Sequence, residues 1–254
     1  MLKIQHLTKT YGDKKAVDDL SLHIQAGEIY GFIGHNGAGK TTTLKAAVGI
    51  LPFDEGTITI NGRSIQTEPL ACKRELAYIP DNPDLYEFMS GIRYLNFIAD
   101  IFGVSAADRQ ARIRDYAARF ELTDDLAQPI AAYSHGMKQK LAIIAAWLHR
   151  PRLVIMDEPF VGLDPKASHL LKGMMRELCD QGGASSSPPT CWRWRRSCAT
   201  RWPSSRAAAS SAPAPWRRSR VTTLWSRCSW NWRTRHAERP SEKAADGDLP
   251  QLFL

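Results

Sequence analysis

The sequence has no run of eighteen apolar residues, and its N-terminus does not have the pattern of a secretory signal peptide. Its five cysteines are scattered along the chain without C-x-x-C spacing. These absences argue against a membrane-spanning helix, a zinc site and a disulfide framework. We therefore expect a cytoplasmic protein, and 254 residues suffice for one large domain or two small ones.

A second absence is confined to one region. Residues 185–237 contain no Asp, Glu, Lys, Ile, Phe or Tyr, although seven of the eight tryptophans lie between Trp192 and Trp232. Residues 1–180 hold 21 Lys and Arg against 22 Asp and Glu, whereas residues 181–254 hold 13 against 4. The net charge of +8 therefore belongs to the tail. A solvated linker does not carry Trp so often, and a folded domain does not omit Ile and Phe.

The stretch 34–42 contains a full match to the phosphate-binding loop pattern G-x-x-x-x-G-K-[ST]. A short apolar segment, 28–33, precedes it as a buried strand would, and residues 43–48 read as the first turns of a helix. Glycines let several backbone N–H groups point at one anion, and the helix N-terminus adds its positive dipole end. The pattern predicts a nucleotide site rather than a glycine-rich turn before an ordinary helix. Its residues are Gly34, His35, Asn36, Gly37, Ala38, Gly39, Lys40, Thr41 and Thr42.

A second segment supplies carboxylates. Residues 153–156 are apolar, and Asp157 and Glu158 follow them directly. Carboxylates at the C-terminal end of a buried strand are costly unless they bind metal or do acid–base work. We expect Asp157 and the Thr41 hydroxyl to hold Mg²⁺, Lys40 to reach the β- and γ-phosphates, and Glu158 to orient or deprotonate an attacking water. The alternative, an acidic cap before a loop, does not account for the phosphate loop.

Other signals are weaker by themselves. Tyr11 is an aromatic residue in a loop upstream of the phosphate loop, where it either stacks on a purine ring or serves as a packing residue. Residues 88–131 contain helical patterns with a broad apolar face, which indicates a packed helical subdomain, with a partner-contacting face as the alternative. Ser134 suits the N-cap of a helical segment that runs to His149. The N-terminus of that helix is another place where backbone N–H groups can bind an anion.

In order and spacing, four segments resemble the ATP-binding-cassette (ABC) transporter ATPases over roughly residues 1–183. They are the phosphate loop GHNGAGKTT, the signature segment YSHGMKQK, the strand LVIMDEP and the loop GLDP. The resemblance implies an α/β fold, with a P-loop NTPase (RecA-like) core, an N-terminal antiparallel β subdomain and a helical subdomain at about 88–148. The segment 80–95 and the KQK run are most similar to the exporter branch, whose membrane subunits are separate chains.

The resemblance also implies roles for residues outside the phosphate loop. In that family two ATP molecules are sandwiched between two such domains. Asp164 would therefore lie at the dimer seam, and Tyr11 would stack on adenine. The signature residues that would face the partner's ATP are Ser134, His135, Gly136 and Met137, with Ser134 and Gly136 contacting the γ-phosphate.

The implied cofactors are ATP and Mg²⁺. The implied partners are a second ABC ATPase domain, in a homo- or heterodimer, and separate transmembrane permease subunits. The protein would thus be cytoplasmic and peripheral on the inner face of the cell membrane.

Two positions depart from the family pattern. Asp81 stands where the family usually has a Gln that reaches Mg²⁺ and senses the membrane subunit. A carboxylate still ligates Mg²⁺, but it adds charge near Asp157 and Glu158 and cannot donate a hydrogen bond. His135 replaces the first of two usual signature glycines and adds bulk without removing Gly136. We expect both departures to be tolerated.

After Ala184 the sequence suggests translation out of frame. If one base was lost near the Ala184 codon, the residues after it are translated one base out of the original frame. Each observed residue then fixes the last two bases of a codon in the original frame. Residues 185–200, SSSPPTCWRWRRSCAT, then read back as IFFSTHVLEVAEKLCD, and residues 206–219 as a leading residue followed by GGRLVSASTMEEV. Both products look like the family's next segments. The first supplies a strand that ends in the switch histidine, which contacts the γ-phosphate in the family, and Thr190 stands nearest its place.

We therefore expect residues 184–254 to be an out-of-frame tail that is disordered or poorly folded. In the family's fold the lost strand lies in the middle of the sheet, beside the phosphate-loop strand. Residues 185–190 are not expected to fill it, because adjacent prolines remove ladder donors and the small side chains bury little. The chain as written should have poor stability, weakened ATP binding and severely reduced hydrolysis.

The leading hypothesis is an ATP-binding and ATP-hydrolysing subunit of an ABC transporter. One alternative is a non-transport ABC ATPase, as in translation or DNA repair, although such proteins usually carry two cassettes or a long coiled-coil insertion. Another is a hydrolysis-defective product whose Arg/Trp tail binds nucleic acid or a membrane surface. Because the frame argument explains the tail's composition without a function, we expect no nucleic-acid partner.

Overall fold

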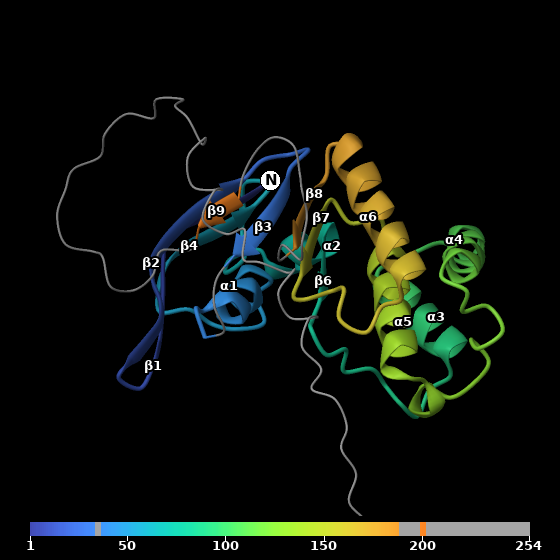
Figure 1. Ribbon diagram of the computed structural model, residues 1–254. Coiled ribbons are helices and arrows are strands. Elements are labelled where there is room, and N and C mark those ends of the chain that lie inside the picture. Colours follow the sequence, from blue (N-terminus) through green and yellow to red (C-terminus); the bar gives the residue numbers. More distant parts are fainter. Residues whose placement is uncertain (34–36, 188–198, 202–254) are drawn as a thin grey trace, which may run out of the picture. The chain divides into compact units, whose positions relative to one another are not determined.

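The computed structural model describes residues 1–33, 37–187 and 199–201 of the chain. Within these residues the strands form two sheets (Figure 1). The antiparallel sheet has the order β2-β1-β4-β5, and the other sheet has the order β6-β7-β8-β3-β9 with every pairing parallel. The antiparallel strands are β1 (Leu2–Tyr11), β2 (Lys14–Ile24), β4 (Glu55–Ile60) and β5 (Arg63–Ser64). The parallel strands are β3 (Ile29–Ile33), β6 (Leu76–Ile79), β7 (Leu153–Met156), β8 (Ala184–Ser187) and β9 (Ala199–Arg201).

Helices lie between the strands along the chain. The helix after the phosphate loop is α1 (Lys40–Ala47), and α2 (Pro69–Glu75) leads into β6. Residues 91–147 contain α3 (Gly91–Ile101), α4 (Ala106–Arg119), the short 3-10 helix η1 (Ile130–Ala132) and α5 (His135–Trp147). The last described helix is α6 (Pro165–Asp180). The α/β class, with an antiparallel β part and a helical part, is therefore confirmed for the described residues.

Local sequence explains where the helices near β7 begin. The Oγ of Ser134 caps α5 by accepting a hydrogen bond from the Met137 N–H, at 3.3 Å. The Oδ1 of Asp164 caps α6 in the same way, accepting from the Ala167 N–H at 2.7 Å. Pro165 then occupies the first helical position, where its missing N–H costs nothing. Both helix starts are thus fixed by side chains that the sequence singled out.

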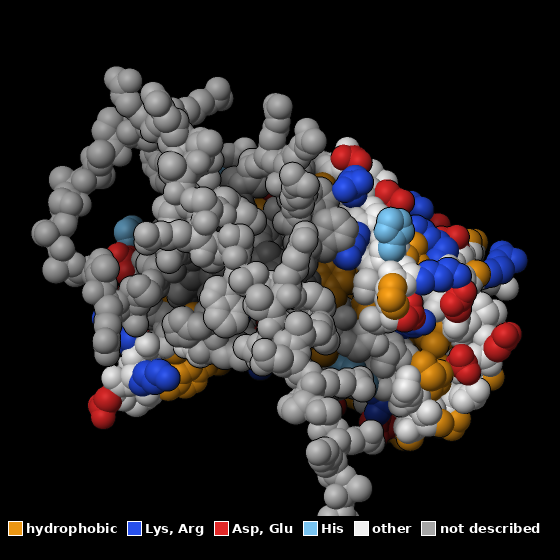
Figure 2. Space-filling model, in the orientation of Figure 1, with side chains coloured by type: hydrophobic (Ala, Val, Ile, Leu, Met, Phe, Trp, Pro, Cys, Tyr) orange, Lys and Arg blue, Asp and Glu red, His pale blue; other side chains and the backbone are white. Residues whose placement is uncertain are grey.

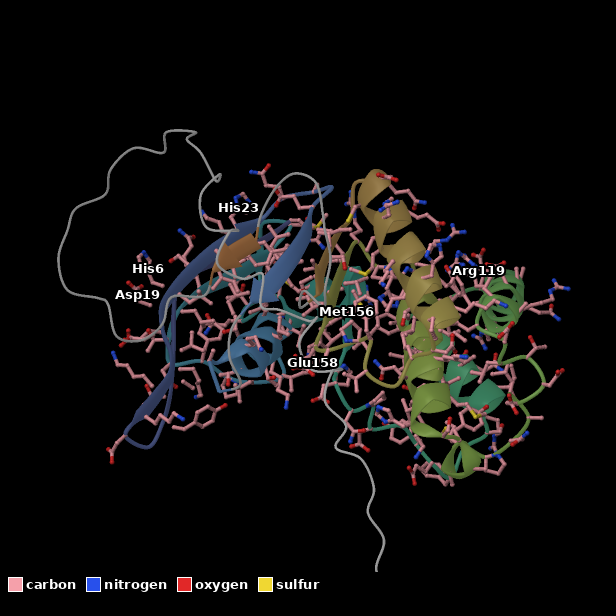
Figure 3. All side chains as sticks on the ribbon, in the orientation of Figure 1. His6, Asp19, His23, Arg119, Met156 and Glu158 are labelled. Carbon is pink, nitrogen blue, oxygen red and sulfur yellow. The ribbon has the colours of Figure 1, made fainter. Side chains whose placement is uncertain are left out.

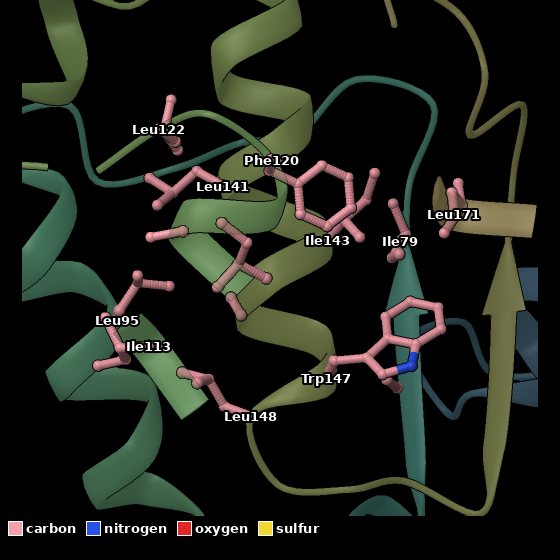
Figure 4. Close-up of a cluster of buried hydrophobic side chains, with 14 of the residues drawn as sticks. Ile79, Leu95, Ile113, Phe120, Leu122, Leu141, Ile143, Trp147, Leu148 and Leu171 are labelled. Atoms are coloured by element: carbon pink, nitrogen blue, oxygen red, sulfur yellow. The ribbon is translucent and has the colours of Figure 1, made fainter. Parts of the chain in front are cut away.

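Buried side chains form two cores, one on each face of the parallel sheet. Val154 and Met156 of β7 pack with the helices α3 to α6, where Leu141, Trp147 and Leu171 are nearly inaccessible (Figure 4). Leu153 and Ile155 of the same strand pack instead with α1 and the antiparallel sheet. Side chains alternate along a strand, so β7 contributes to both cores. The residues that follow β7 are consequently anchored from both faces of the sheet.

The central strand β8 corrects one expectation from the sequence. Ala184–Ser187 lies between β7 and β3, with Ser185 opposite Ile29 and Ser186 opposite Ile155. The prediction that residues 185–190 cannot fill this position is wrong for residues 185–187, because backbone N–H and C=O groups form a ladder whatever the side chain. The adjacent prolines come only after the strand, at positions outside the described residues. The ordered sheet therefore extends past the domain boundary drawn at residue 183, and the division into domains stays a prediction.

The strand carries side chains that do not suit it. Ser185 and Ser186 are both 0% exposed. Within the described part of the chain, neither hydroxyl has a hydrogen-bond partner. A buried, unpartnered hydroxyl costs on the order of 1–3 kcal/mol. Polar side chains in the middle of an otherwise apolar sheet are the structural counterpart of the composition change after Ala184.

The surface of the helical part mixes charges of both signs. On the face in Figure 2, Lys and Arg side chains alternate with Asp and Glu side chains over the helices. Several pair along one helix or between helices, among them Arg112 with Asp108 and Arg119 with Glu177. In the described ranges, no helix combines the length and apolarity needed to cross a bilayer.

Candidate functional site

The turn into α1 requires glycine. Gly39 has a φ of 84°, and a Cβ at this position would lie 2.2 Å from the carbonyl oxygen of Ala16. Gly37 has a φ of 83°, in the same left-handed region. α1 starts at Lys40 directly after Gly39. The predicted residues Gly34, His35 and Asn36 lie outside the described residues, but the described half of the loop has the backbone that the phosphate-binding pattern needs.

The start of α1 meets the end of β7. The hydroxyl of Thr41 donates a hydrogen bond of 2.6 Å to Oδ2 of Asp157. Asp157 is only 5% exposed, and its backbone N–H donates to the carbonyl of Ile79 at 2.9 Å. Two residues 116 positions apart in the sequence are thus brought together. A hydroxyl and a buried carboxylate offer the oxygen ligands that Mg²⁺ prefers, so this pair fits that ion.

Glu158 adopts a backbone conformation unusual for its type. Its φ is 48°, in the left-handed region where a residue with a Cβ is strained. In Figure 3, Glu158 lies just past Met156, on the side of α1. Strained residues concentrate at functional sites, where the surroundings hold them in place. The side chain is half-buried, as is that of Lys40 at the start of α1.

Asp81 follows the neighbouring strand. β6 and β7 are parallel, with Ile79 opposite Met156, so Asp81 and Asp157 come after strands that end at the same edge. Both carboxylates act on Tyr78: its pKa is raised to about 12, mainly because the phenol is buried and also because Asp157 and Asp81 carry negative charge nearby. Asp81 itself is exposed. The predicted metal residues Thr41, Asp157 and Asp81 therefore lie in one region.

The signature residues lie at the first turn of α5. Ser134 and His135 are exposed, whereas Gly136 and Met137 are half-buried. A Cβ at Gly136 would lie 2.6 Å from the carbonyl oxygen of Gly162, in the loop after β7. Position 136 thus needs glycine for a close backbone approach, which explains why a histidine is accommodated at 135 and not one residue later.

Tyr11 is not a core residue. It lies at the end of β1 and is 50% exposed, with the Lys9 ammonium 5.6 Å from its ring centroid. Asp164 is also exposed, and its Oδ2 pairs with the Nζ of Lys140 at 2.7 Å. Thr190, which stands nearest the place of the switch histidine, lies outside the described residues.

Sequence reasoning missed two neighbouring residues of α5. Gln139 is 0% exposed and its Nε2 donates to the carbonyl of Pro159, at 3.3 Å. Lys140 pairs with Asp164. The available signal was a glutamine on the apolar face of the helix, four residues before Ile143. Such a residue reads as a solvated polar position until the loop that it contacts is placed.

The parallel sheet, the glycine turn into α1 and the acidic pair after β7 together define a P-loop nucleotide-binding protein. Comparison with known sequences narrows this class. The profile of the ABC transporter family matches residues 17–161, and the chain belongs to that family.

Individual relatives agree. The chain is 38% identical to the uncharacterized ABC transporter ATP-binding protein YhaQ of Bacillus subtilis over 182 residues, which are 72% of this chain and 60% of YhaQ. It is 35% identical to the ABC-type transporter ATP-binding protein EcsA of the same organism over 185 residues, 73% of this chain and 74% of EcsA. The chain thus spans only about three-fifths of the length of YhaQ.

Solved structures give the same fold. The structure of an ATP-binding subunit of an ABC transporter matches with a TM-score of 0.71 and 37% identity, over 74% of this chain and 79% of that chain. A dimeric ATP-binding cassette in a post-hydrolysis state, bound to ADP and Pi, matches with a TM-score of 0.67 over 73% of this chain and 86% of that chain. At 20% identity the second match supports the fold alone.

Proposed function

We propose that this chain binds ATP with Mg²⁺ and hydrolyses it as the ATP-binding subunit of an ABC transporter. The observation that carries the proposal is the hydrogen bond between Thr41 and Asp157, which joins the phosphate-loop helix to the acidic end of β7. In a protein of this family, that junction is where the terminal phosphates and a divalent cation fit.

The roles of the residues follow from their positions. The backbone N–H groups of the turn before α1 bind phosphate oxygens, and Lys40 neutralises their charge. Thr41 and Asp157 would hold Mg²⁺, and Asp81, which follows the neighbouring strand β6, would supply a further oxygen ligand. When bound, the cation neutralises charge on the β- and γ-phosphates. Glu158, fixed at the end of β7, orients the attacking water and accepts its proton.

A second copy or a related domain completes the site. We infer that Ser134, His135, Gly136 and Met137 present the N-terminus of α5 to the partner's ATP, and that Asp164 lies at the seam. Tyr11, exposed at the end of β1, is available to stack on adenine. The exposure of Ser134 and His135 is compatible with this arrangement.

The membrane partner would bind an apolar patch, mostly of aromatic side chains, before and on α3. The patch consists of Tyr86, Phe88, Tyr94, Phe97 and Ile101, and in it the Tyr86 ring lies 5.7 Å from that of Phe97 and 5.8 Å from that of Phe88. Phe88 is 80% and Ile101 61% exposed. Clustered exposed aromatics are typical of protein interfaces. We propose that permease subunits of the exporter type, made as separate chains, dock here and hold the protein at the inner face of the membrane.

The tail is best explained as an out-of-frame translation. The buried, unpartnered hydroxyls of Ser185 and Ser186 support this hypothesis, because the older reading places Ile and Phe at these two positions of the central strand. The same reading supplies the switch histidine. The chain as written would then bind ATP weakly and turn it over very slowly.

Two measurements test the proposal. Equilibrium binding of a fluorescent ATP analogue with Mg²⁺ should be detectable for the chain as written and lost in Lys40→Ala. Binding that is unaffected by Lys40→Ala would refute the assignment of the phosphate site.

For the tail, intact mass and peptide mapping of the native protein decide between the two reading frames. Peptides with SSSPPTCWR mean that the frame change is real. Peptides with FFSTHVLEVAEK mean that the native chain has its histidine.

A further inference from the structure

The loop between β7 and α6, residues 157–164, contacts α5 along two successive turns. At the first turn, Gly136 lies against the carbonyl of Gly162. At the second turn, Gln139 donates to the carbonyl of Pro159 at 3.3 Å, and Lys140 pairs with Asp164 at 2.7 Å. Residues three and four apart on a helix share a face, so one side of α5 holds both ends of this loop.

The burial of these contacts gives them weight. Gln139 is fully buried and, in the part of the chain that the structure describes, its Oε1 has no hydrogen-bond partner. A leucine or methionine would avoid that cost, so the contact with Pro159 is what Gln139 provides. The Lys140 side chain is only 15% exposed. Its ion pair is therefore shielded from solvent more than an ordinary surface pair, which contributes little.

Asp164 uses both of its carboxylate oxygens. Oδ2 pairs with Lys140, and Oδ1 caps α6 by accepting from the Ala167 N–H. The Lys140 hydrogen bond, and then the Ala167 N–H, lower the pKa of Asp164 below its usual value. One side chain thus links α5, the loop and α6.

We propose that Gln139 and Lys140 are positioning residues that fix the loop carrying Glu158 to the signature helix. This inference rests on the proposed function, in which the N-terminus of α5 faces the partner's ATP. The first turn of α5 then senses the nucleotide of one composite site, while the second turn holds Glu158 in the other. Through this helix, occupancy of the partner's nucleotide sets the position of the chain's own catalytic carboxylate.

The test compares variants of the full chain. Lys140→Met removes the ion pair, Gln139→Met removes the Pro159 hydrogen bond at similar volume, and Lys140→Arg keeps the charge. Lys138→Met is the matched control, because Lys138 lies on the same helix but pairs with Glu87 outside the loop. Hydrogen exchange of the amides of residue 158 and residues 160–164 reports on the loop, and sedimentation with Mg-ATP reports on dimer formation.

We expect loop exchange about five- to tenfold faster in Lys140→Met and Gln139→Met, and unchanged in Lys140→Arg and Lys138→Met. The ATP concentration for half-maximal dimerisation should rise at least about fivefold in the first two variants, while ADP affinity changes less than about twofold. Unchanged loop exchange in both variants would refute the positioning role. Faster exchange with unaltered dimerisation would refute the coupling. If the unmodified chain does not dimerise with Mg-ATP, the proposed function and the coupling fail together, whereas exchange still decides whether Gln139 and Lys140 hold the loop.

Discussion

At the scale of single residues, the most informative side chains are the two serines of β8. Ser185 and Ser186 are fully buried at central positions of the parallel sheet, yet within the described residues neither hydroxyl has a hydrogen-bond partner. They cost stability in the folded state and little in the unfolded chain, where water solvates the hydroxyls.

Replacing these serines by alanine should stabilise the chain. We expect Ser185→Ala and Ser186→Ala each to raise the free energy of unfolding by about 1 kcal/mol, because each removes a buried unpartnered group without adding volume. Urea denaturation measures the change. Ser105→Ala is the opposite-sign control: its Oγ caps α4 by accepting from the Asp108 N–H, and its loss should cost about 1 kcal/mol. Destabilisation by both β8 variants would contradict the assigned cost.

Glu158 offers a second test at this scale. Asn tolerates the left-handed region better than other residues with a Cβ, so Glu158→Asn should be more stable than Glu158→Gln by about 0.5–1 kcal/mol. Both variants should lack hydrolysis in any chain that otherwise hydrolyses ATP. Thermal unfolding of the two proteins, side by side, measures the difference. Equal stabilities would contradict the strain assigned to the left-handed backbone at position 158.

At the scale of elements, one histidine links three of them. His149 follows α5, its ring stacks on Phe102 at the end of α3 with centroids 3.8 Å apart, and its Nε2 lies 3.1 Å from the carbonyl of Leu76 in β6. Burial lowers its pKa below the usual 6.5, aided by the charge of Arg112 and opposed by the Leu76 hydrogen bond. The neutral ring is therefore the form that the folded protein accommodates.

This site predicts a pH dependence of stability. Because the folded-state pKa lies below 6.5, the unfolded chain binds the proton more tightly. The contribution of His149 is fully present above pH 6.5 and is lost as the pH falls through the folded-state pKa, with a slope of at most about 1.4 kcal/mol per pH unit. His149→Gln, which can still donate to Leu76, should remove this slope between about pH 7 and 5.5. An unchanged slope would assign the titration to another group.

The elements also show what the sequence could and could not predict. The phosphate loop and β7 were predictable, because a fixed glycine pattern and four apolar residues before two carboxylates are local signals. That the serines would form the central strand β8 was not predictable, because ASSS has no strand pattern of its own and pairs there through its backbone with β7 and β3. The role of Gln139 was equally hidden, since its partner is a backbone carbonyl 20 residues away. Local chemistry is readable from the sequence, whereas contacts that the fold creates are not.

At the scale of the whole molecule, the reading frame determines which side chains the central strand β8 buries between the two cores. We expect a chain with IFFSTHVLEVAEKLCD at residues 185–200 to have a free energy of unfolding several kcal/mol larger than that of the chain as written. Burying each Ile or Phe side chain contributes about 1.5–3 kcal/mol. It should also hydrolyse ATP, and replacing its switch histidine by alanine should abolish most of that turnover. Calorimetry and phosphate release measure both properties. Equal stability and turnover in the two chains would contradict the frame hypothesis.

The sheet order has a consequence for how the chain is made. β3 carries the phosphate loop and ends at residue 33, but its neighbour β8 begins only at residue 184. A ribosome adds about 5–20 residues per second, so β3 waits on the order of ten to thirty seconds before its partner has been synthesised. During that interval an apolar strand with open edges and the glycine-rich turn after it are exposed to the cytosol. Chaperone demand during translation should therefore be set by the arrival of β8, and a nascent chain released before residue 184 should be a preferred substrate for degradation.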